Sequence, residues 1–260
     1  MAFLLRTRRR LLAFGGGLAL VGVAAAGCGG DGNAPVTATT TVGSTVTAAA
    51  SVQAGTTGRY ESVAAALEKV SYPQDLIDGT ALGKKDARVV IQAFEDFTCS
   101  HCLEFSAEME PAIVEQLVKP GTVRFEFHYL PLRQSSVGIM VAAQCAADQG
   151  RFWEYHRALF IAQAKADAKP QDQYAQAMND GFGEVALKQY AADLKLDTAK
   201  FGDCLASPQP AIDKIQADLT QASKLGIKGT PGFVVNGRFL GDSYPANIAA
   251  WKKLVEGAAK

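Results

Sequence analysis

The 260-residue sequence lacks the motifs that indicate nucleotide, flavin or metal chemistry. No G-x-G-x-x-G or P-loop sequence follows an expected strand, so no dinucleotide or phosphate site is indicated. Histidine occurs only three times. The single C-x-x-C motif has neither a second copy nor a pair of clustered histidines to complete a zinc site. We therefore expect no cofactor and no metal.

An excess of positive charge is also missing. The formal net charge is zero, but four of the 26 basic residues precede Cys28, where no acidic residue occurs. The rest of the chain has 22 basic and 26 acidic residues, a net charge of −4. This gives no electrostatic reason to bind nucleic acid. Hydrophobic residues at 48% and charged residues at 20% predict an ordinary folded protein with a core.

The first 28 residues have the pattern of an export signal. The basic stretch Arg6–Arg10 precedes seventeen uncharged residues, 11–27, which are mostly apolar or glycine. This run is shorter than the roughly 20 strongly apolar residues of a membrane-spanning helix. Thr7–Leu12 resembles the twin-arginine export motif, and Ala25–Cys28 resembles a lipobox, in which cleavage leaves Cys28 as a lipid-bearing N-terminus. An uncleaved signal anchor is the alternative. Both place the remaining chain outside the cytoplasm, at a membrane.

Residues 29–58 differ from the rest in composition. Thr, Ala, Val, Gly and Ser dominate, Asp31 is the only charged residue, and no helical period is visible. Such a segment buries too little surface to offset the entropy lost on ordering, so we predict a flexible tether. The folded domain is then expected at 59–260.

The most informative feature is the C-x-x-C motif formed by Cys99 and Cys102. Residues 87–94 before it are apolar and β-branched, which predicts a buried strand, and residues 103–117 repeat apolar side chains at helical spacing. Cys99 therefore lies at a helix N-terminus, where unpaired N–H groups and the helix dipole lower a thiol pKa. We interpret Cys99 as the attacking thiol and Cys102 as the buried resolving thiol. A protonated His101 between them would favour the Cys99 thiolate.

A zinc half-site and a purely structural disulfide are the competing interpretations of a lone C-x-x-C. The remaining chain favours redox chemistry. Pro111 should kink the helix after the motif, and residues 122–129 alternate as a strand. Thr230-Pro231 precedes another apolar strand, where a proline belongs at the first position. Asn236-Gly237 predicts a hairpin, and 245–257 a final helix.

This order of elements resembles the thioredoxin fold, an α/β fold that here has a large helical insertion at about 131–225. The F-x-D/E-F-x-C-x-x-C stretch and the insertion resemble the DsbA-like thiol:disulfide oxidoreductases, from about Asp75 to Lys260. The resemblance implies that Cys99 is the nucleophile and Cys102 the resolving thiol. It also implies that Thr230-Pro231 is a cis-proline pair beside the disulfide, and that Thr230, the residue before the proline, offers backbone groups to the substrate.

Further residues are interpreted by the same resemblance. Ser100 stands where many family members have proline, and the dipeptide between the cysteines tunes the redox potential. Similar cysteines to Cys145 and Cys204 pair in some DsbA-like proteins, so we expect a structural disulfide rather than two buried free thiols. His128 and His156 are expected at a surface or core edge rather than as catalytic bases. The aromatic residues around His156 are expected in the core.

Together with the export-signal and lipobox patterns, the resemblance predicts a lipid-anchored, extracytoplasmic thiol:disulfide oxidoreductase. It would pass the Cys99–Cys102 disulfide to reduced exported proteins, and a membrane quinone-linked thiol oxidase would re-oxidise it. One alternative is a reductase or isomerase that runs the same chemistry backwards. Another is a thioredoxin-fold binding or chaperone lipoprotein in which the cysteines are incidental.

Replacement of Cys28 by alanine is expected to release the protein into the soluble extracytoplasmic fraction. The lipobox pattern offers Cys28 alone for lipid attachment, and oxidoreductase activity should stay intact because the motif cysteines are untouched. Cell fractionation followed by immunoblotting measures the distribution. Protein that stays membrane-bound after its signal has been removed would show that the lipid-anchor prediction is wrong.

Overall fold

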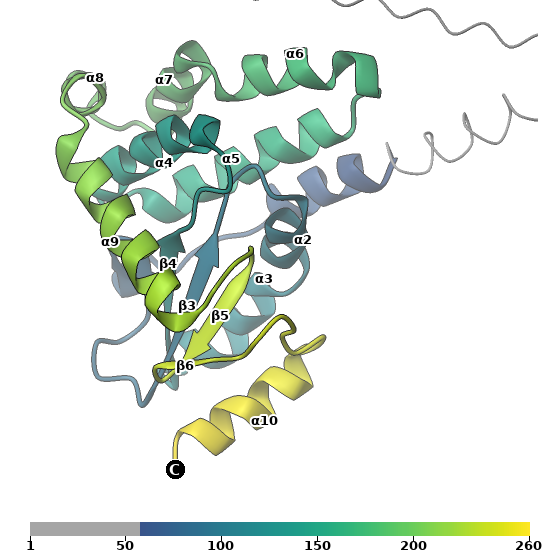
Figure 1. The fold of residues 1–260 in the computed structure, drawn as a ribbon, viewed down its shortest axis with the longest axis vertical. Coiled ribbons are helices and arrows are strands. Elements are labelled where there is room, and N and C mark those ends of the chain that lie inside the picture. Colours follow the sequence, from purple (N-terminus) through teal and green to yellow (C-terminus); the bar gives the residue numbers. More distant parts are fainter. Residues whose placement is uncertain (1–57) are drawn as a thin grey trace, which may run out of the picture. The chain divides into compact units, whose positions relative to one another are not determined.

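The computed structural model describes residues 58–260. The expected export signal, the lipidation site Cys28 and the tether up to residue 57 lie outside the described residues. The described chain has a six-stranded mixed sheet in the order β1-β2-β4-β3-β5-β6, with helices packed around it (Figure 1). The strands are β1 (Ile77–Asp78), β2 (Ala81–Leu82), β3 (Val89–Glu95), β4 (Val123–Tyr129), β5 (Gly232–Val235) and β6 (Arg238–Phe239).

The two apolar runs of the sequence form the centre of the sheet. β3 and β4 pair in parallel, from Val89 opposite Val123 to Glu95 opposite Tyr129. Alternate residues of β4 are fully buried and those between them are partly exposed, as a strand with one covered face requires. β5 pairs antiparallel with the other edge of β3. The carboxyl end of β3 therefore lies between two strands.

The Asn236–Gly237 turn forms the predicted hairpin between β5 and β6. Both residues have positive φ, 47° and 81°, which Asn and Gly tolerate and a tight hairpin turn requires. The Asn236 Oδ1 also accepts a hydrogen bond from the Val90 N–H at 2.8 Å. Its Nδ2 donates to the carbonyls of Arg88, at 3.3 Å, and Ala258, at 3.1 Å. The turn thus ties β5 to β3 and to the C-terminal helix.

The helix after Cys99 is interrupted where Pro111 predicts a kink. α2 (Ser100–Glu108) ends at Met109, whose φ of −111° and ψ of −43° turn the chain into α3 (Glu110–Ile113), with Pro111 in the first turn. A proline there lacks the N–H that a continuous helix needs. A π-helical segment, η2 (Val114–Val118), completes the connection to β4.

The chain between β4 and β5 is the expected helical insertion, and it carries a cross-link. A disulfide joins Cys145 to Cys204, 59 residues apart, the pair for which the sequence resemblance implied one. Within residues 58–260 no helix is long and apolar enough to cross a membrane. The helices of the insertion are α4 (Gln134–Ala147), α5 (Phe152–Asp167), α6 (Gln171–Phe182), α7 (Glu184–Asp193), α8 (Thr198–Ala206) and α9 (Gln209–Leu225).

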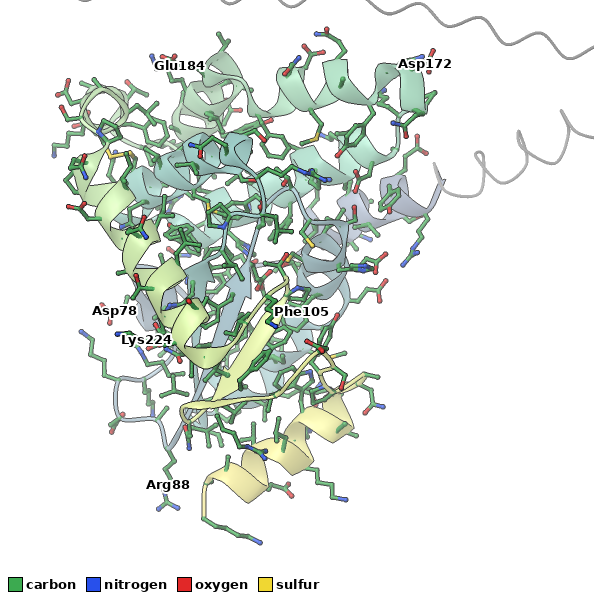
Figure 2. The ribbon with its side chains drawn as sticks, viewed as in Figure 1. Asp78, Arg88, Phe105, Asp172, Glu184 and Lys224 are labelled. Atoms are coloured by element: carbon green, nitrogen blue, oxygen red, sulfur yellow. A yellow bond between two sulfur atoms is a disulfide. The ribbon has the colours of Figure 1, made fainter. Side chains whose placement is uncertain are left out.

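Three further elements flank the sheet: a helix over residues 58–67, the short 3-10 helix η1 (Gln74–Leu76) and the C-terminal helix α10 (Ile248–Ala258). The sequence placed the start of the last helix at 245, three residues too early. The helix begins after Asn247, because the Asn247 side chain accepts the Ala250 N–H at 3.0 Å and caps the first turn. Charged side chains such as Arg88, Asp172 and Lys224 point outward (Figure 2).

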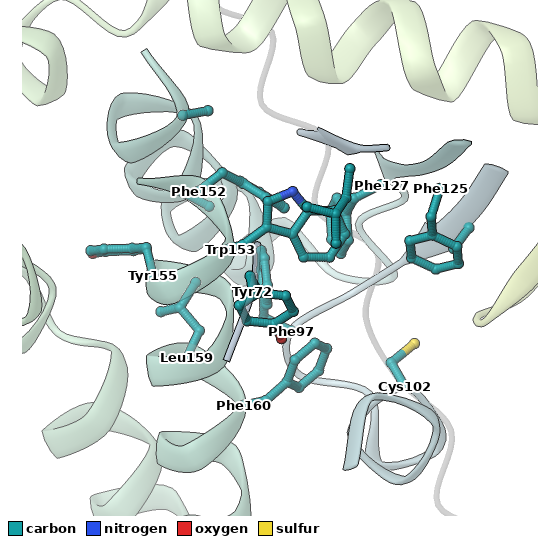
Figure 3. Packing of buried hydrophobic residues seen from close by; sticks show 14 of the residues in the cluster. Tyr72, Phe97, Cys102, Phe125, Phe127, Phe152, Trp153, Tyr155, Leu159 and Phe160 are labelled. Atoms are coloured by element: carbon teal, nitrogen blue, oxygen red, sulfur yellow. The ribbon is translucent and has the colours of Figure 1, made fainter. Parts of the chain in front are cut away.

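The aromatic residues of α5 lie in the core, as expected. They pack with the rings of β4 and with Phe97, and Cys102 belongs to the same buried cluster (Figure 3). This packing fixes the helical insertion against the sheet face that lies beneath the C-x-x-C motif. The large apolar side chains of α5 that are fully buried are Phe152, Trp153, Tyr155, Leu159 and Phe160.

The expectation that His156 lies at a helix surface or core edge is wrong. Its side chain is fully buried among aromatic rings, including those of Phe127 and Phe160. Burial alone lowers the pKa of His156 to about 3, so the ring is neutral. The spacing contained the signal, because Phe152 and Phe160 lie four residues before and after His156 and therefore share its helix face.

Replacement of both Cys145 and Cys204 by alanine is expected to lower the free energy of unfolding by about 4 kcal/mol, because the cross-link closes a 59-residue loop in the unfolded chain. Urea denaturation followed by circular dichroism measures the loss. The acidity of Cys99 should not change. A loss below about 1 kcal/mol would contradict the chain-entropy explanation.

Candidate active site

Cys99 and Cys102 lie where the carboxyl end of β3 meets the first turn of α2. Cys99 is the N-cap residue of α2, with extended φ and ψ of −96° and 118°. Its carbonyl accepts the first helical hydrogen bond, from the Leu103 N–H at 3.0 Å. Both cysteines are free thiols, with Cys99 partly exposed and Cys102 buried. The structure thus shows the reduced form of the motif.

The two thiols have opposite acidities. A hydrogen bond from the Cys102 thiol lowers the pKa of Cys99 to about 5, and backbone N–H groups of Cys102 and His101 contribute in the same direction against the effect of burial. Burial raises the pKa of Cys102 well above its usual value, and its hydrogen bond to Cys99 adds to the shift. At neutral pH, Cys99 is therefore a thiolate and Cys102 a thiol. The sequence predicts this difference in exposure and acidity between the two thiols, and their roles as attacking and resolving thiol stay a prediction.

The Thr230-Pro231 pair lies against the cysteines. The bond between the two residues is cis. Because Gly232 of β5 pairs with Phe94 of β3, the residues just before β5 reach the end of β3. The Cys99 Sγ lies 3.4 Å from the Thr230 carbonyl oxygen. Segments 131 positions apart in the sequence thus meet at one sulfur atom.

Asp96 holds the loop that carries Cys99, although its role was not predicted. The side chain is fully buried. Its Oδ1 accepts hydrogen bonds from the Thr98 N–H, at 2.8 Å, and the Thr98 hydroxyl, at 2.9 Å. Its Oδ2 accepts from the Leu132 N–H at 2.7 Å, at the start of the helical insertion. The signal was an Asp followed two residues later by Thr, a common side-chain turn.

Glu95 is a second residue that was not predicted. It ends β3 fully buried, and neither of its carboxylate oxygens has a hydrogen-bond partner among the described residues. Burial raises its pKa well above the usual value, and nearby negative charge, including that of Cys99, adds to the shift. In turn, a charge on Glu95 would raise the pKa of Cys102. The signal was the strand alternation, because Ile91, Ala93 and Glu95 share the buried face.

A second buried carboxyl group, Glu110, lies in the same region. Burial raises its pKa to about 8, so it is mainly protonated at neutral pH. Its Oε1 accepts a hydrogen bond from the Tyr72 hydroxyl at 2.8 Å. Its Oε2 lies 3.6 Å from the His156 Nε2. Beneath Cys102, the fold therefore keeps neutral groups that can hold or release protons.

The predicted role of the His101 ring stays a prediction. The side chain is 79% exposed, and its Nδ1 lies 3.7 Å from the Glu104 Oε2. The Cys99 pKa is lowered chiefly by the hydrogen bond from the Cys102 thiol, and His101 contributes a smaller effect in the same direction through its backbone N–H. His128 lies elsewhere, where its Nδ1 is 2.8 Å from the Asp218 Oδ1 of α9. Within residues 58–260 no group of three His, Cys, Asp or Glu side chains is arranged to hold a metal ion.

Comparison with known proteins gives a family match over most of the described chain. The profile of the family described as thioredoxin matches residues 75–257, which include both motif cysteines and the cis-proline. Disulfide bond formation protein D of Bacillus subtilis (strain 168) is 24% identical over 184 residues, which cover 69% of this chain and 75% of that protein.

Two more matches are a much longer relative in sequence and a solved structure that is covered over most of its length. The Na(+)/H(+) antiporter NhaA 1 of Salinispora arenicola (strain CNS-205) is 33% identical over 179 residues. The match covers 68% of this chain and 24% of the antiporter, so the chain spans about a quarter of that relative's length. The crystal structure of oxidised BdbD from Bacillus subtilis superposes with a TM-score of 0.57 at 21% identity, covering 70% of this chain and 92% of that one. This likeness shows a shared fold.

Alkylation of the reduced protein at mildly acidic pH is expected to label Cys99 first. With a pKa of about 5, Cys99 is mostly thiolate at such a pH, whereas Cys102 is a buried thiol. Pulse labelling with iodoacetamide from about pH 4 to about pH 8, read by peptide mass spectrometry, measures the rates. The Cys99 rate should fall as the pH drops through about 5. Faster labelling of Cys102 would overturn the assignment of roles.

Proposed function

The chain belongs to the thioredoxin family as a DsbA-like member, and we propose that it is an extracytoplasmic thiol:disulfide oxidoreductase that introduces disulfides into exported proteins. One observation carries the proposal: a thiolate at a helix N-terminus, a buried thiol one turn on, and a cis-proline loop all meet at Cys99. An incidental pair of cysteines has no need for such unequal acidities.

The reaction begins with the Cys99–Cys102 disulfide. A substrate thiolate attacks the Cys99 sulfur, so a bond forms between substrate and Cys99 while the Cys99–Cys102 bond breaks and Cys102 leaves. A second substrate thiolate then attacks the substrate sulfur of this mixed disulfide and expels Cys99. Two electrons pass from the substrate to the protein. Cys99 is a good leaving group because the pKa of its thiol is about 5.

The buried Cys102 needs a proton partner, and we assign this role to Glu95. Cys102 leaves as a thiolate in a site where a charge is poorly solvated. The pKa of Glu95, which burial raises well above its usual value, brings the carboxyl group closer in acidity to a thiol, so it can exchange a proton with Cys102. During re-oxidation Cys99 first forms a mixed disulfide with the oxidant. Cys102 then gives this proton back to the ionised Glu95, attacks the Cys99 sulfur and expels the oxidant's thiolate. The absence of any hydrogen bond to the Glu95 oxygens among the described residues leaves both free for this transfer.

The stabilised Cys99 thiolate favours the oxidising direction. Whatever stabilises the reduced form makes the disulfide a stronger oxidant. The N–H groups of Cys102 and His101 make strong hydrogen bonds to the Cys99 sulfur only when that sulfur carries negative charge, so they stabilise the reduced form selectively. Reduced exported proteins are the proposed substrates, a membrane quinone-linked thiol oxidase is the proposed recycling partner, and lipid on Cys28 is the proposed membrane anchor.

A redox titration against glutathione tests the direction. We expect a midpoint closer to about −120 mV than to about −270 mV, the values of a strong oxidant and of thioredoxin. A midpoint below about −230 mV, in the range of reducing glutaredoxins, would favour the reductase or isomerase instead. The Cys102→Ala variant, with Cys99 first converted to a mixed disulfide with glutathione, should exchange glutathione for a reduced substrate and trap that substrate on Cys99, and Cys99→Ala treated in the same way should trap none. Absence of a trapped species would favour the binding or chaperone alternative.

Replacement of Glu95 by glutamine is expected to slow re-oxidation by about a hundredfold, because an amide cannot accept the Cys102 proton. Stopped-flow oxidation of the reduced protein by a small disulfide, measured as a function of pH, reports this step. The matched control is Glu115→Gln on the exposed side of η2, which should not change the rate. An unchanged rate in Glu95→Gln would exclude the carboxyl group as the proton partner.

A further inference from the structure

Ser100, between the two motif cysteines, makes a contact that reaches into the helical insertion. Its Oγ donates a hydrogen bond to the Asp167 Oδ2 at 3.0 Å, which joins residues 67 positions apart. Ser100 is the first residue of α2 and Asp167 is the last residue of α5. Both side chains are half-buried. The contact therefore links α5 to the helical turn whose N–H groups face Cys99.

Asp167 is itself held from a second side. The Gln163 Nε2, one turn earlier in α5, donates to the Asp167 Oδ1 at 2.8 Å. Gln163 is fully buried, and its carboxamide oxygen has no hydrogen-bond partner among the described residues. An unpaired buried polar group costs about 1–3 kcal/mol, so this position is not optimised for stability. What the arrangement achieves is a fixed orientation of the Asp167 carboxylate.

The position of Ser100 explains why it needs an external contact. It occupies the first position of α2, where proline is favoured because its ring fixes φ near the helical value. Serine has no such constraint, but it has a hydroxyl group that can donate. The hydrogen bond to Asp167 therefore supplies from α5 the restriction that a proline ring would supply within the turn itself.

We propose that Asp167 is a positioning residue that, through Ser100, sets the acidity of Cys99 and the oxidising strength of the disulfide. The anchored first turn keeps the N–H groups of His101 and Cys102 aimed at the Cys99 sulfur. Asp167 makes and breaks no bond in the reaction. The inference rests on the proposed function, because it concerns the same pair of cysteines.

The direction in which the Cys99 pKa changes distinguishes a charge effect of Asp167 from a positioning effect. Asp167 lies close enough to Tyr60, in the helix over residues 58–67, for its charge to add to the rise in the Tyr60 pKa that burial causes. The charge of Glu104 in α2 adds in the same way to the rise in the Asp167 pKa that burial causes. Glu104 also pairs with Arg59 at 2.8 Å and lies 3.7 Å from the His101 ring. If Asp167 acted only through its negative charge, its removal would lower the pKa of Cys99. Loss of the anchor instead misaligns the N–H donors and raises that pKa.

Asp167→Ala and Ser100→Ala, made in the full chain, test the inference. We expect each to raise the Cys99 pKa, followed by thiolate absorbance, and to lower the equilibrium constant for oxidation of glutathione by about threefold to tenfold, as for loss of one hydrogen bond. The double variant should show no further change, because both residues act through one contact. Asp167→Asn and Ser100→Thr, which keep an acceptor and a hydroxyl donor, should restore most of the effect.

A matched control is available in α6. There the Gln176 Nε2 donates to the Asp180 Oδ1 at 2.7 Å, the same Gln-to-Asp pair one turn apart. Asp180→Ala should leave the Cys99 pKa and the equilibrium constant unchanged. A second test uses Ser100→Pro, in which the ring replaces the anchor. In that background, Asp167→Ala should have no effect on either quantity.

Three results would overturn the inference: a lowered Cys99 pKa in Asp167→Ala, an unchanged pKa in both alanine variants, or an equal shift in Asp180→Ala. Thermal unfolding of each variant shows whether it is folded. If Asp167→Ala does not fold, the Cys99 pKa of Ser100→Ala decides the test. Failure of the proposed function is distinguishable. An activated Cys102→Ala variant that traps no substrate refutes the function, whereas an active wild-type protein whose Asp167 and Ser100 variants show no shift refutes only the role of Asp167.

Discussion

The chemistry of this protein depends on the unpaired N–H groups at the start of α2. A helix N-terminus has donors without intrahelical partners, and here the Cys99 sulfur lies in front of them. The rest of the fold keeps that turn in place. Asp96 fixes the loop before it, and the packing of Phe105 on Phe233 of β5, with ring centroids 4.6 Å apart, holds α2 to the sheet. The acidity of one thiol is therefore a property of several distant segments.

The same site combines a polar surface with a core that is nearly free of charge. Cys99 is reached from solvent, while Cys102 lies in an aromatic cluster together with neutral His156. In that environment a proton is held more readily than an ion. The raised pKa values of Glu95 and Glu110 follow from this condition. The contrast between the two sides of the motif is what gives chemically identical thiols different roles.

Local patterns predicted the elements of the fold well, because they depend on neighbouring residues. Strand alternation located β4, Asn-Gly located the hairpin, and C-x-x-C before a helical period located the site. The residues that escaped prediction depend on tertiary packing. Glu95 is a charged residue, which residue type alone would place at a surface, although the strand alternation puts it on the buried face. Asp167 meets Ser100 only because α5 packs beside α2. The sequence-based expectation for His156 was wrong because it considered the polarity of histidine alone and not the phenylalanines that share its helix face.

The cross-link between α4 and α8 has a consequence for how the protein matures. Ribosomes release a chain with reduced cysteines, so Cys145 and Cys204 must lose two electrons to an acceptor after synthesis. For an oxidoreductase of the proposed kind, each newly made copy is thus a substrate of the reaction before it becomes its catalyst. Mature copies already present can supply that oxidation: their Cys99–Cys102 disulfide takes up the two electrons as the Cys145–Cys204 bond forms, and the proposed recycling oxidase must then remove those electrons.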